Sequence, residues 1–219
     1  MLKYRCLVLD HDDTVVQTEK TMGYPHFCNT LRNIRPGQFI SLTDYVQTCH
    51  KLGFVDMCRA LWSFTDEELN AEHKDWKDYV LTHIAPPFPG MAEIIHKQKA
   101  EGGILCVVSH SDSSIIARDY ETHFGTQPDA IYGFDLPKEQ RKPAPYPLLD
   151  IMERFGLQPE DLYVVDDTKL AHTMAKAVNV AIGFAAWSKA EFPTLKEEMT
   201  ALCDHTFDTT QSLYDFLFK

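Results

Sequence analysis

Polar side chains suited to bond-breaking chemistry follow short apolar runs at several points in this chain. The first group is the segment DHDDT at residues 10–14, directly after the apolar run at residues 4–9. Residues i and i+2 leave a strand on the same side, so the carboxylates of Asp10 and Asp12 are expected to converge on one pocket. One carboxylate can then act as a nucleophile, while its neighbour, held partly protonated, serves as general acid and base. The alternative is an aspartate-rich turn that caps a following helix.

Two further groups supply hydrogen-bond donors and a positive charge. The segment SHSD at residues 109–112 follows an apolar run at residues 103–108, and the hydroxyl of Ser109 can donate to a phosphoryl oxygen. Lys142 precedes Pro143 in a polar loop, and its ammonium group is a compact charge suited to an anionic nucleophile or a phosphate. Each group also has an ordinary structural explanation, as a helix N-cap for the serine segment and as a solvated loop residue for the lysine.

An adjacent pair of aspartates, Asp166 and Asp167, follows the apolar run at residues 162–165. Two neighbouring carboxylates at a buried strand end repel each other, so a cation is expected to neutralise them. Mg²⁺ prefers hard oxygen ligands and keeps several waters, which suits carboxylates at such an edge. Capping of the next helix would need only one of the two carboxylates, so the pair itself favours a metal site.

These polar groups are expected to be positioned by an α/β fold. Short runs rich in Val, Leu and Ile, with little alternation, are typical of strands buried on both faces of a parallel sheet. Such runs lie at residues 4–9, 103–108, 162–165 and 180–184. Helical patterns lie at residues 91–101, 113–124, 145–155 and 168–178. The alternation predicts a doubly wound parallel sheet, in which ligands bind at the carboxyl ends of the strands, where Asp10, Ser109 and Asp166 lie.

The region between the first strand and the rest of the α/β pattern has a different character. It contains no convincing buried strand, but apolar residues recur at helical spacing within residues 41–52 and 65–84. A proline-rich break then precedes the α/β pattern. We therefore predict an all-helical insert at residues 17–87 and an α/β core made of residues 1–16 and 88–219.

The composition restricts the partners of the protein. The chain has 219 residues, and 21 basic against 32 acidic side chains give a formal net charge of −11. An acidic protein lacks the basic field with which nucleic-acid and anionic-membrane binders meet phosphate, so neither partner is expected. No apolar stretch approaches the ~20 residues that span a bilayer, no signal peptide is recognisable, and the six cysteines form no zinc pattern. A cytoplasmic protein with reduced cysteines is expected.

In their order and at these strand ends, the motifs resemble those of the haloacid dehalogenase (HAD) superfamily of phosphohydrolases over nearly the whole chain. The matching residues are Asp10, Asp12, Thr14, Ser109, Lys142, Asp166 and Asp167. The helical insert after the first motif is similar to the cap of the phosphoglycolate phosphatase and β-phosphoglucomutase subgroup. His11, His110 and Ala171 depart from the residues usual in the family, but none of them replaces a core catalytic group.

The resemblance implies a HAD-like phosphoric monoester hydrolase that uses Mg²⁺, forms an aspartyl-phosphate and acts on a small phosphorylated metabolite. Asp10 would be the nucleophile, and Asp12 would be the acid and base. The catalytic set would be completed by Ser109 and Lys142, which stabilise the phosphoryl oxygens. The residues expected to bind phosphate are Thr14, Ser109, His110 and Lys142. The expected metal ligands are the Asp10 carboxylate, the Asp12 main-chain carbonyl, and Asp166 and Asp167, either of which can be the direct ligand.

Other functions stay open at this point. A phosphomutase similar to β-phosphoglucomutase would return the phosphoryl group to a sugar, so a hexose 1-phosphate would yield the 6-phosphate and not free phosphate. A non-catalytic binding protein with the HAD fold is less consistent with the chain, because every side chain of the catalytic set is present. Dehalogenation is disfavoured because Asp12 marks the phosphatase branch of the family, and a halide leaving group needs no protonation.

Overall fold

The chain divides into two compact units in the computed structural model, which describes residues 2–219. One unit comprises the segments up to Val16 and from Pro87 to Lys219, and the other comprises Gln17–Pro86. The first is an α/β unit, and the secondary structure of the second is helical. No helix within residues 2–219 is both long enough and apolar enough to cross a lipid bilayer.

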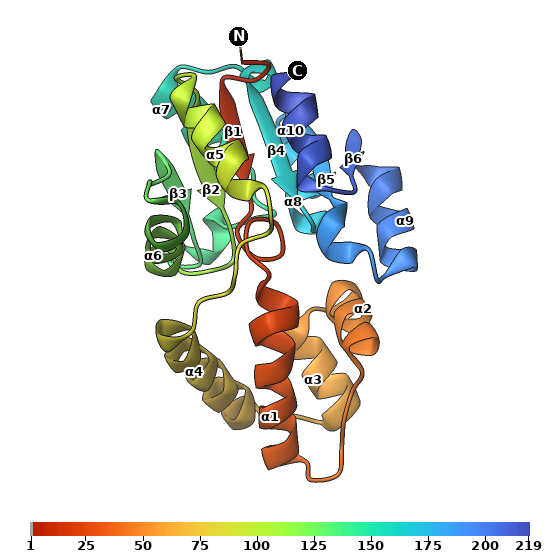
Figure 1. Ribbon diagram of the computed structural model, residues 1–219. Coiled ribbons are helices and arrows are strands. Elements are labelled where there is room, and N and C mark those ends of the chain that lie inside the picture. Colours follow the sequence, from red (N-terminus) through yellow and green to blue (C-terminus); the bar gives the residue numbers. More distant parts are fainter. Residues whose placement is uncertain (1) are drawn as a thin grey trace. The chain divides into compact units, whose positions relative to one another are not determined.

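A six-stranded parallel sheet forms the centre of the α/β unit (Figure 1). The strands are β1 (Cys6–Leu9), β2 (Ile104–Val108), β3 (Ala130–Tyr132), β4 (Leu162–Asp166), β5 (Ala181–Ala185) and β6 (His205–Phe207). Their order across the sheet is β3-β2-β1-β4-β5-β6, and each neighbouring pair is parallel. The predicted doubly wound parallel sheet is confirmed.

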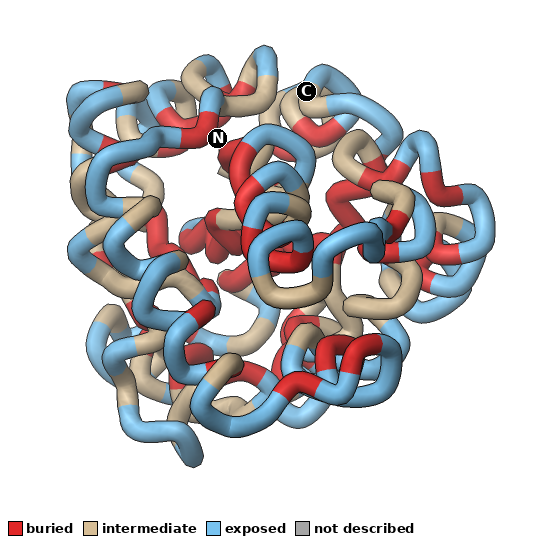
Figure 2. Tube along the Cα trace, turned by 90° about the horizontal axis from the view of Figure 1, so that it is seen from below, coloured by how far each residue is buried: buried red, intermediate tan, exposed pale blue. Residues whose placement is uncertain are grey.

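Helices cover both faces of this sheet. They are α5 (Met91–Ala100), α6 (Ser113–Phe124), α7 (Tyr146–Phe155), α8 (Lys169–Ala177), α9 (Pro193–Leu202) and α10 (Thr210–Phe218), with short turns η2 (Lys138–Gln140), η3 (Pro159–Asp161) and η4 (Ala186–Lys189). Helix α5 contacts α6 and α10 on one face, and Figure 1 shows α5 and α10 in front of the strands. Helices α7 and α8 pack on the opposite face. Along the helices, buried and exposed residues alternate, as expected for amphipathic segments (Figure 2).

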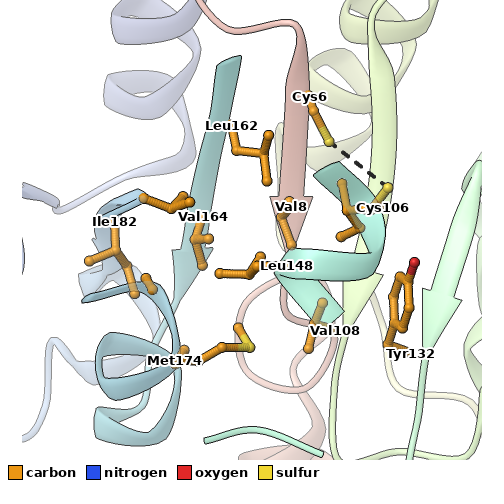
Figure 3. Packing of buried hydrophobic residues seen from close by; sticks show 14 of the residues in the cluster. Cys6, Val8, Cys106, Val108, Tyr132, Leu148, Leu162, Val164, Met174 and Ile182 are labelled. Atoms are coloured by element: carbon orange, nitrogen blue, oxygen red, sulfur yellow. Dashed lines mark hydrogen bonds between the residues drawn. The ribbon is translucent and has the colours of Figure 1, made fainter. Parts of the chain in front are cut away.

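The sheet is buried because alternate strand residues point into two separate layers of side chains. On one face, Val8, Val108 and Val164 lie in a hydrophobic cluster with Leu148 of α7 and Met174 of α8 (Figure 3). Burial of the central strands on both faces removes any reason for polar residues to alternate along them. This is why β1, β2, β4 and β5 are recognisable as continuous apolar runs.

The register of the three central strands sets the level of the polar residues that follow them. Leu9 of β1 is paired with Val107 of β2 and with Val165 of β4. Asp10 and Asp166 are therefore next to each other at the same level, and the backbone N–H of Asp10 donates to the Val165 carbonyl at 3.0 Å. The chain leaves β1 toward β2 on one side and returns to β4 on the other, and such a switch point is where doubly wound sheets bind ligands.

The helical unit has well-defined helix starts and stops. It contains the π-helical turn η1 (Glu19–Gly23), α1 (Tyr24–Ile34), α2 (Leu42–Leu52), α3 (Phe54–Trp62) and α4 (Asp66–Thr82). The side chain of Ser41 caps α2, and Thr65 with Glu68 forms a reciprocal capping box at the start of α4. Gly53, with φ of 82°, separates α2 from α3 in a conformation that favours glycine.

Aromatic side chains form the core of the helical unit. The ring centroid of Phe27 in α1 lies 5.3 Å from that of Tyr45 and 5.4 Å from those of Phe54 and Trp62. These rings come from α1, α2 and α3, so one buried phenylalanine joins three short helices. Offset aromatic contacts of this kind stabilise a small core beyond the area they bury.

A buried carboxyl in the helical unit is expected to make stability depend on pH. Glu72 of α4 lies near His26, and burial, followed by the charge of Asp75, raises its pKa from 4.5 to about 7. The folded state therefore holds this proton more tightly than the unfolded chain, and stability falls as the pH rises through that interval. We expect Glu72→Gln to remove this fall in stability at high pH. The variant should be more stable than the wild-type protein by roughly 2–3 kcal/mol at pH 8, with little difference at pH 5.

Urea unfolding at the two pH values, followed by tryptophan fluorescence, measures this effect. Trp62 and Trp76 lie in the helical unit and report its unfolding. Glu67→Gln, at an exposed position of the same helix, is the matched control and is expected to leave the pH dependence unchanged. Equal unfolding free energies of Glu72→Gln and the wild-type protein at pH 8 would contradict the expectation.

Candidate active site

The polar groups predicted from the sequence meet at the carboxyl ends of β1, β2 and β4. Asp10 follows β1, Ser109 follows β2, and Asp166 is the last residue of β4. Lys142 comes from the loop before α7, and its side chain is buried among the acids. The fold thus brings together side chains from four segments that are far apart in the sequence.

The ammonium group of Lys142 bridges two buried carboxylates. Its Nζ lies 2.8 Å from Asp10 Oδ1 and 2.8 Å from Asp166 Oδ2. Burial by itself lowers the pKa of this lysine, but the two carboxylates more than offset that effect and raise the pKa above its usual value. Lys142 therefore stays charged, and it links the segment after β1 to the end of β4.

Asp10 is crowded by negative charge. Its side chain is buried, and burial followed by the carboxylate of Asp166 raises its pKa well above the usual value, while Lys142 opposes the rise. The charges of Asp167 and Asp12 add to the crowding. Carboxylates arranged in this way ionise together only when a further cation balances them.

Two serine hydroxyls hold the carboxylate of Asp12. Ser111 Oγ donates to Asp12 Oδ2 at 2.6 Å, and Ser109 Oγ donates to the same oxygen at 3.3 Å. The backbone N–H of Ser111 in turn donates to Ser109 Oγ at 3.3 Å. The segment after β2 therefore fixes the orientation of the Asp12 side chain.

The two aspartates at the end of β4 have different surroundings. Both oxygens of Asp166 are occupied, because Oδ1 accepts from the N–H and the hydroxyl of Thr168 at 2.8 and 2.7 Å and Oδ2 pairs with Lys142. Asp167 Oδ2 lies 2.7 Å from the ammonium group of Lys189. Its Oδ1 is buried, and no hydrogen-bond donor within residues 2–219 reaches it. A buried oxygen in that state is costly unless a ligand satisfies it, so Asp167 Oδ1 is the better placed atom to bind a cation.

Asp10, Asp166 and Asp167 form a compact cluster that fits a hard divalent cation. Each offers one carboxylate oxygen, these atoms lie within 4.8 Å of one another, and all three residues are buried. The segments after β1 and at the end of β4 carry five aspartates, and within residues 2–219 the buried lysines are Lys142 and Lys189, which pair with four of them. Oxygen donors with an excess of negative charge are the donor set that Mg²⁺ prefers.

Thr14 and His110, both predicted to bind phosphate, differ in exposure. The Thr14 hydroxyl is fully buried, and its backbone carbonyl accepts a hydrogen bond from the indole N–H of Trp187 at 3.2 Å. His110 is exposed, and its Nε2–H donates to the backbone carbonyl of Lys142 at 2.9 Å. Of the two, His110 is the residue that solvent or a ligand can reach.

The histidine between Asp10 and Asp12 packs into the protein interior. His11 is buried, and its Nε2 lies 3.2 Å from Asp119 Oδ2 on α6. Its ring centroid lies 6.1 Å from that of Tyr120 on the same helix. These contacts make His11 part of the packing between the segment after β1 and α6.

Three polar residues of this region are not singled out by sequence reasoning. They are Ser111, Asp13 and Lys189. Lys189 Nζ lies 2.7 Å from Asp13 Oδ2 as well as from Asp167 Oδ2. A partial signal is present, because Lys189 follows the predicted strand at residues 180–184 and so lies near the same edge of the sheet. Ser111 and Asp13 lie within the predicted motifs, but nothing in the sequence distinguishes them from the other serine and aspartate residues there.

A comparison with protein families matches residues 7–185 to the haloacid dehalogenase-like hydrolases. The matched region contains the acids after β1 and β4, the serine segment after β2 and Lys142. The chain belongs to the haloacid dehalogenase-like hydrolases. The resemblance inferred from the motifs is confirmed, and so is the prediction of an enzyme of this family.

Solved structures share this HAD fold over nearly the whole chain. A candidate phosphoglycolate phosphatase from Lactobacillus plantarum has a TM-score of 0.77 and 18% identity over 97% of this chain and 99% of its own. A predicted phosphoglycolate phosphatase from Haemophilus somnus has a TM-score of 0.74 and 19% identity over 99% of both chains. A mutant of CbbY from Rhodobacter sphaeroides, in complex with xylulose-(1,5)bisphosphate, has a TM-score of 0.70 and 16% identity over 94% of this chain and 95% of its own. No curated protein sequence matches the chain.

Proposed function

We propose that this HAD hydrolase is a Mg²⁺-dependent phosphatase that hydrolyses a small phosphorylated metabolite through an aspartyl-phosphate on Asp10. The observation that carries the proposal is the buried cluster of Asp10, Asp166 and Asp167, with Lys142 between two of its members. Membership of the hydrolase family supports the choice of a catalytic role over a purely binding one.

In the first half-reaction, a carboxylate oxygen of Asp10 forms a bond to phosphorus, and the bond from phosphorus to the leaving oxygen breaks. Asp12 gives its proton to that oxygen, so the product leaves as a neutral alcohol. The hydroxyl of Ser111 holds the Asp12 side chain in one orientation for this transfer, and the single proton of Ser109 is then donated to the phosphoryl group instead of to Asp12. Lys142 balances the negative charge of Asp10 and, with Ser109, stabilises the charge on the phosphoryl oxygens.

In the second half-reaction, Asp12 accepts a proton from water while the water oxygen forms a bond to phosphorus. The bond between phosphorus and the Asp10 oxygen breaks, which releases inorganic phosphate and restores the carboxylate. The same residue therefore acts first as acid and then as base, and Asp12 returns to its protonated form at the end of the cycle.

We propose that the carboxylates of Asp10 and Asp167 and the main-chain carbonyl of Asp12 bind Mg²⁺ directly. Asp166 contributes indirectly, through its ion pair with Lys142. Bound there, the cation would supply charge stabilisation for the phosphoryl group. Asp167 is the proposed direct ligand of the adjacent pair because no hydrogen-bond donor within residues 2–219 reaches its Oδ1, whereas both oxygens of Asp166 are occupied. Asp166 then serves to hold Lys142 in place.

The helical unit, Gln17–Pro86, is proposed to be a cap that shields the reaction from bulk water and selects the leaving group. It interrupts the α/β unit directly after the first acidic motif, between Val16 and Pro87.

A small phosphorylated metabolite is the proposed substrate, because the acidic composition disfavours polyanions and because the similar CbbY binds a sugar bisphosphate.

Phosphate release from p-nitrophenyl phosphate and from a panel of sugar and short-chain phosphates tests the proposal. We expect activity with Mg²⁺, loss of activity with EDTA, and recovery when Mg²⁺ is added in excess. A hexose 1-phosphate in the panel is expected to give free phosphate, and the 6-phosphate as product would show a phosphomutase instead. Hydrolysis that is unaffected by EDTA would contradict the proposed role of Mg²⁺. If none of the compounds is hydrolysed, the proposal that the protein is a phosphatase is contradicted.

A further inference from the structure

We propose that Lys189 is a positioning residue that fixes which oxygen of Asp167 faces the cation. Lys189 ends the short turn η4 after β5, and its side chain is buried. Its Nζ lies 2.7 Å from Asp167 Oδ2 and 2.7 Å from Asp13 Oδ2, so it joins the end of β4 to the segment after β1. The inference rests on the proposed function, in which Asp167 is a metal ligand.

The bridge brings together two residues whose placement is unfavourable by itself. A buried ammonium group loses its hydration, and the carboxylates of Asp167 and Asp13, each 2.7 Å from Lys189 Nζ, offset that loss. Asp13 has a φ of 54°, a left-handed conformation that glycine adopts more readily than aspartate. An apolar residue would fill the position of Lys189, and a glycine would suit the backbone at position 13, so packing alone does not account for the pair.

The two oxygens of Asp167 differ because of this bridge. Oδ2 is held by Lys189, whereas Oδ1 is buried and no donor within residues 2–219 reaches it. One Asp167 oxygen lies within 4.8 Å of carboxylate oxygens of Asp10 and Asp166, and we assign that role to Oδ1 because Oδ2 is already paired. A carboxylate held at one oxygen cannot rotate freely about its last bond, so the other oxygen is presented in one direction. Partners that orient metal ligands in this way commonly tune metal affinity.

The bridge through Lys189 parallels the one through Lys142. Each lysine pairs with one aspartate after β1 and one aspartate at the end of β4, so that Lys142 holds Asp10 and Asp166 while Lys189 holds its own pair. The turn η4 is attached to the segment after β1 a second time, through the indole N–H of Trp187 and the carbonyl of Thr14. Lys142 thus contacts the proposed nucleophile, Asp10, and Lys189 contacts the proposed metal ligand, Asp167.

A charge-matched variant separates positioning from simple electrostatics. Lys189→Met alone would remove a positive charge and so would also change the attraction for a cation. Lys189→Met combined with Asp13→Asn removes one charge of each sign and leaves Asp167 without its bridge. Isothermal titration of the metal-free full-length protein with Mg²⁺ is expected to show about tenfold weaker binding for this double variant. The Mg²⁺ concentration for half-maximal activity is expected to rise by a similar factor, with a smaller change in kcat.

The matched control is the double variant Lys196→Met with Asp208→Asn, which removes an ion pair of 2.6 Å on the surface of the same unit. It is expected to bind Mg²⁺ as the wild-type protein does. Asp167→Asn is expected to abolish binding, and absence of binding by the wild-type protein would contradict the proposed function and not the role of Lys189 alone. Wild-type affinity in the charge-matched variant, within twofold, would overturn the inference.

A third variant keeps the inference testable if the charge-matched variant does not fold. Lys189→Arg retains the positive charge but replaces a compact ammonium group by a longer planar group, which displaces Asp167 Oδ2. Its Mg²⁺ affinity is expected to fall while its circular dichroism spectrum and unfolding midpoint stay close to those of the wild-type protein. An unchanged Mg²⁺ affinity in a folded Lys189→Arg protein would overturn the proposed positioning role of Lys189, as would wild-type affinity in the charge-matched variant.

Discussion

Asp10→Asn is expected to lower phosphate release from p-nitrophenyl phosphate by at least about 10³-fold, since removal of a nucleophile in other enzymes costs up to about 10⁶-fold. The amide has the shape of the carboxylate but cannot form an aspartyl-phosphate. Steady-state assays at saturating Mg²⁺ measure the loss. Retention of more than a few per cent of wild-type activity would contradict the assignment of Asp10 as the nucleophile.

The same variant is expected to keep its fold, which separates loss of chemistry from loss of structure. In the metal-free protein, burial and the carboxylate of Asp166 already raise the pKa of Asp10, so a neutral amide at this position relieves repulsion. Lys142 keeps its contact with Asp166 Oδ2 at 2.8 Å. We expect the unfolding temperature of metal-free Asp10→Asn to equal or exceed that of the wild-type protein.

A control for this comparison is Asp78→Asn, at an exposed position of α4. It makes the same chemical change far from the acidic cluster in the sequence, and it is expected to leave both activity and unfolding temperature unchanged. A marked drop in the unfolding temperature of Asp10→Asn would show that the carboxylate is needed for folding, and the activity loss would then require another explanation.

The α/β fold was predictable because its central strands are buried on both faces. The runs that end at Leu9, Val108 and Val165 have no reason to alternate with polar residues, so each is visible as an apolar block followed by an acid or a serine. The strands β3 and β6 were not predicted, since each has three residues and β6 is partly exposed. So short a segment carries too little pattern to distinguish a strand from a loop.

The clustering of the acids was predictable because chemistry restricts their types and because they follow strands that the sequence reveals. Lys142 lies in the loop before α7, and it was expected near the acids from its charge and from the resemblance of the motifs to the HAD family. Asp13 and Lys189 also come after predicted strands, but their ion pair was not predictable, because 176 residues separate the two partners and nothing in the local sequence links them. The choice between Asp166 and Asp167 as metal ligand was also open. It depends on which oxygens are already occupied by Thr168, and that information exists only in three dimensions.

Lys142→Met is expected to lower the unfolding free energy of the metal-free protein by about 3–5 kcal/mol, because one buried ammonium group holds two buried carboxylates. Asp10 and Asp166 would then face each other without a cation, and their pKa values would rise further. As the pH falls, these two carboxylates in the folded variant would be protonated and their repulsion would disappear. The loss of stability is therefore expected to be smaller at pH 5 than at pH 8. Urea unfolding at both pH values measures this.

Activity of Lys142→Met at saturating Mg²⁺ is expected to fall by about 10²–10³-fold, the usual cost of removing a preorganised group that stabilises developing charge. Combining Lys142→Met with Asp166→Asn removes one charge of each sign, and this double variant is expected to recover most of the lost stability but little of the activity. That pattern would separate the structural role of Lys142, which depends on Asp166, from its role toward the phosphoryl group. Recovery of activity together with stability would show instead that Lys142 acts only by holding the aspartates, and stability unchanged by Lys142→Met would contradict the buried bridge itself.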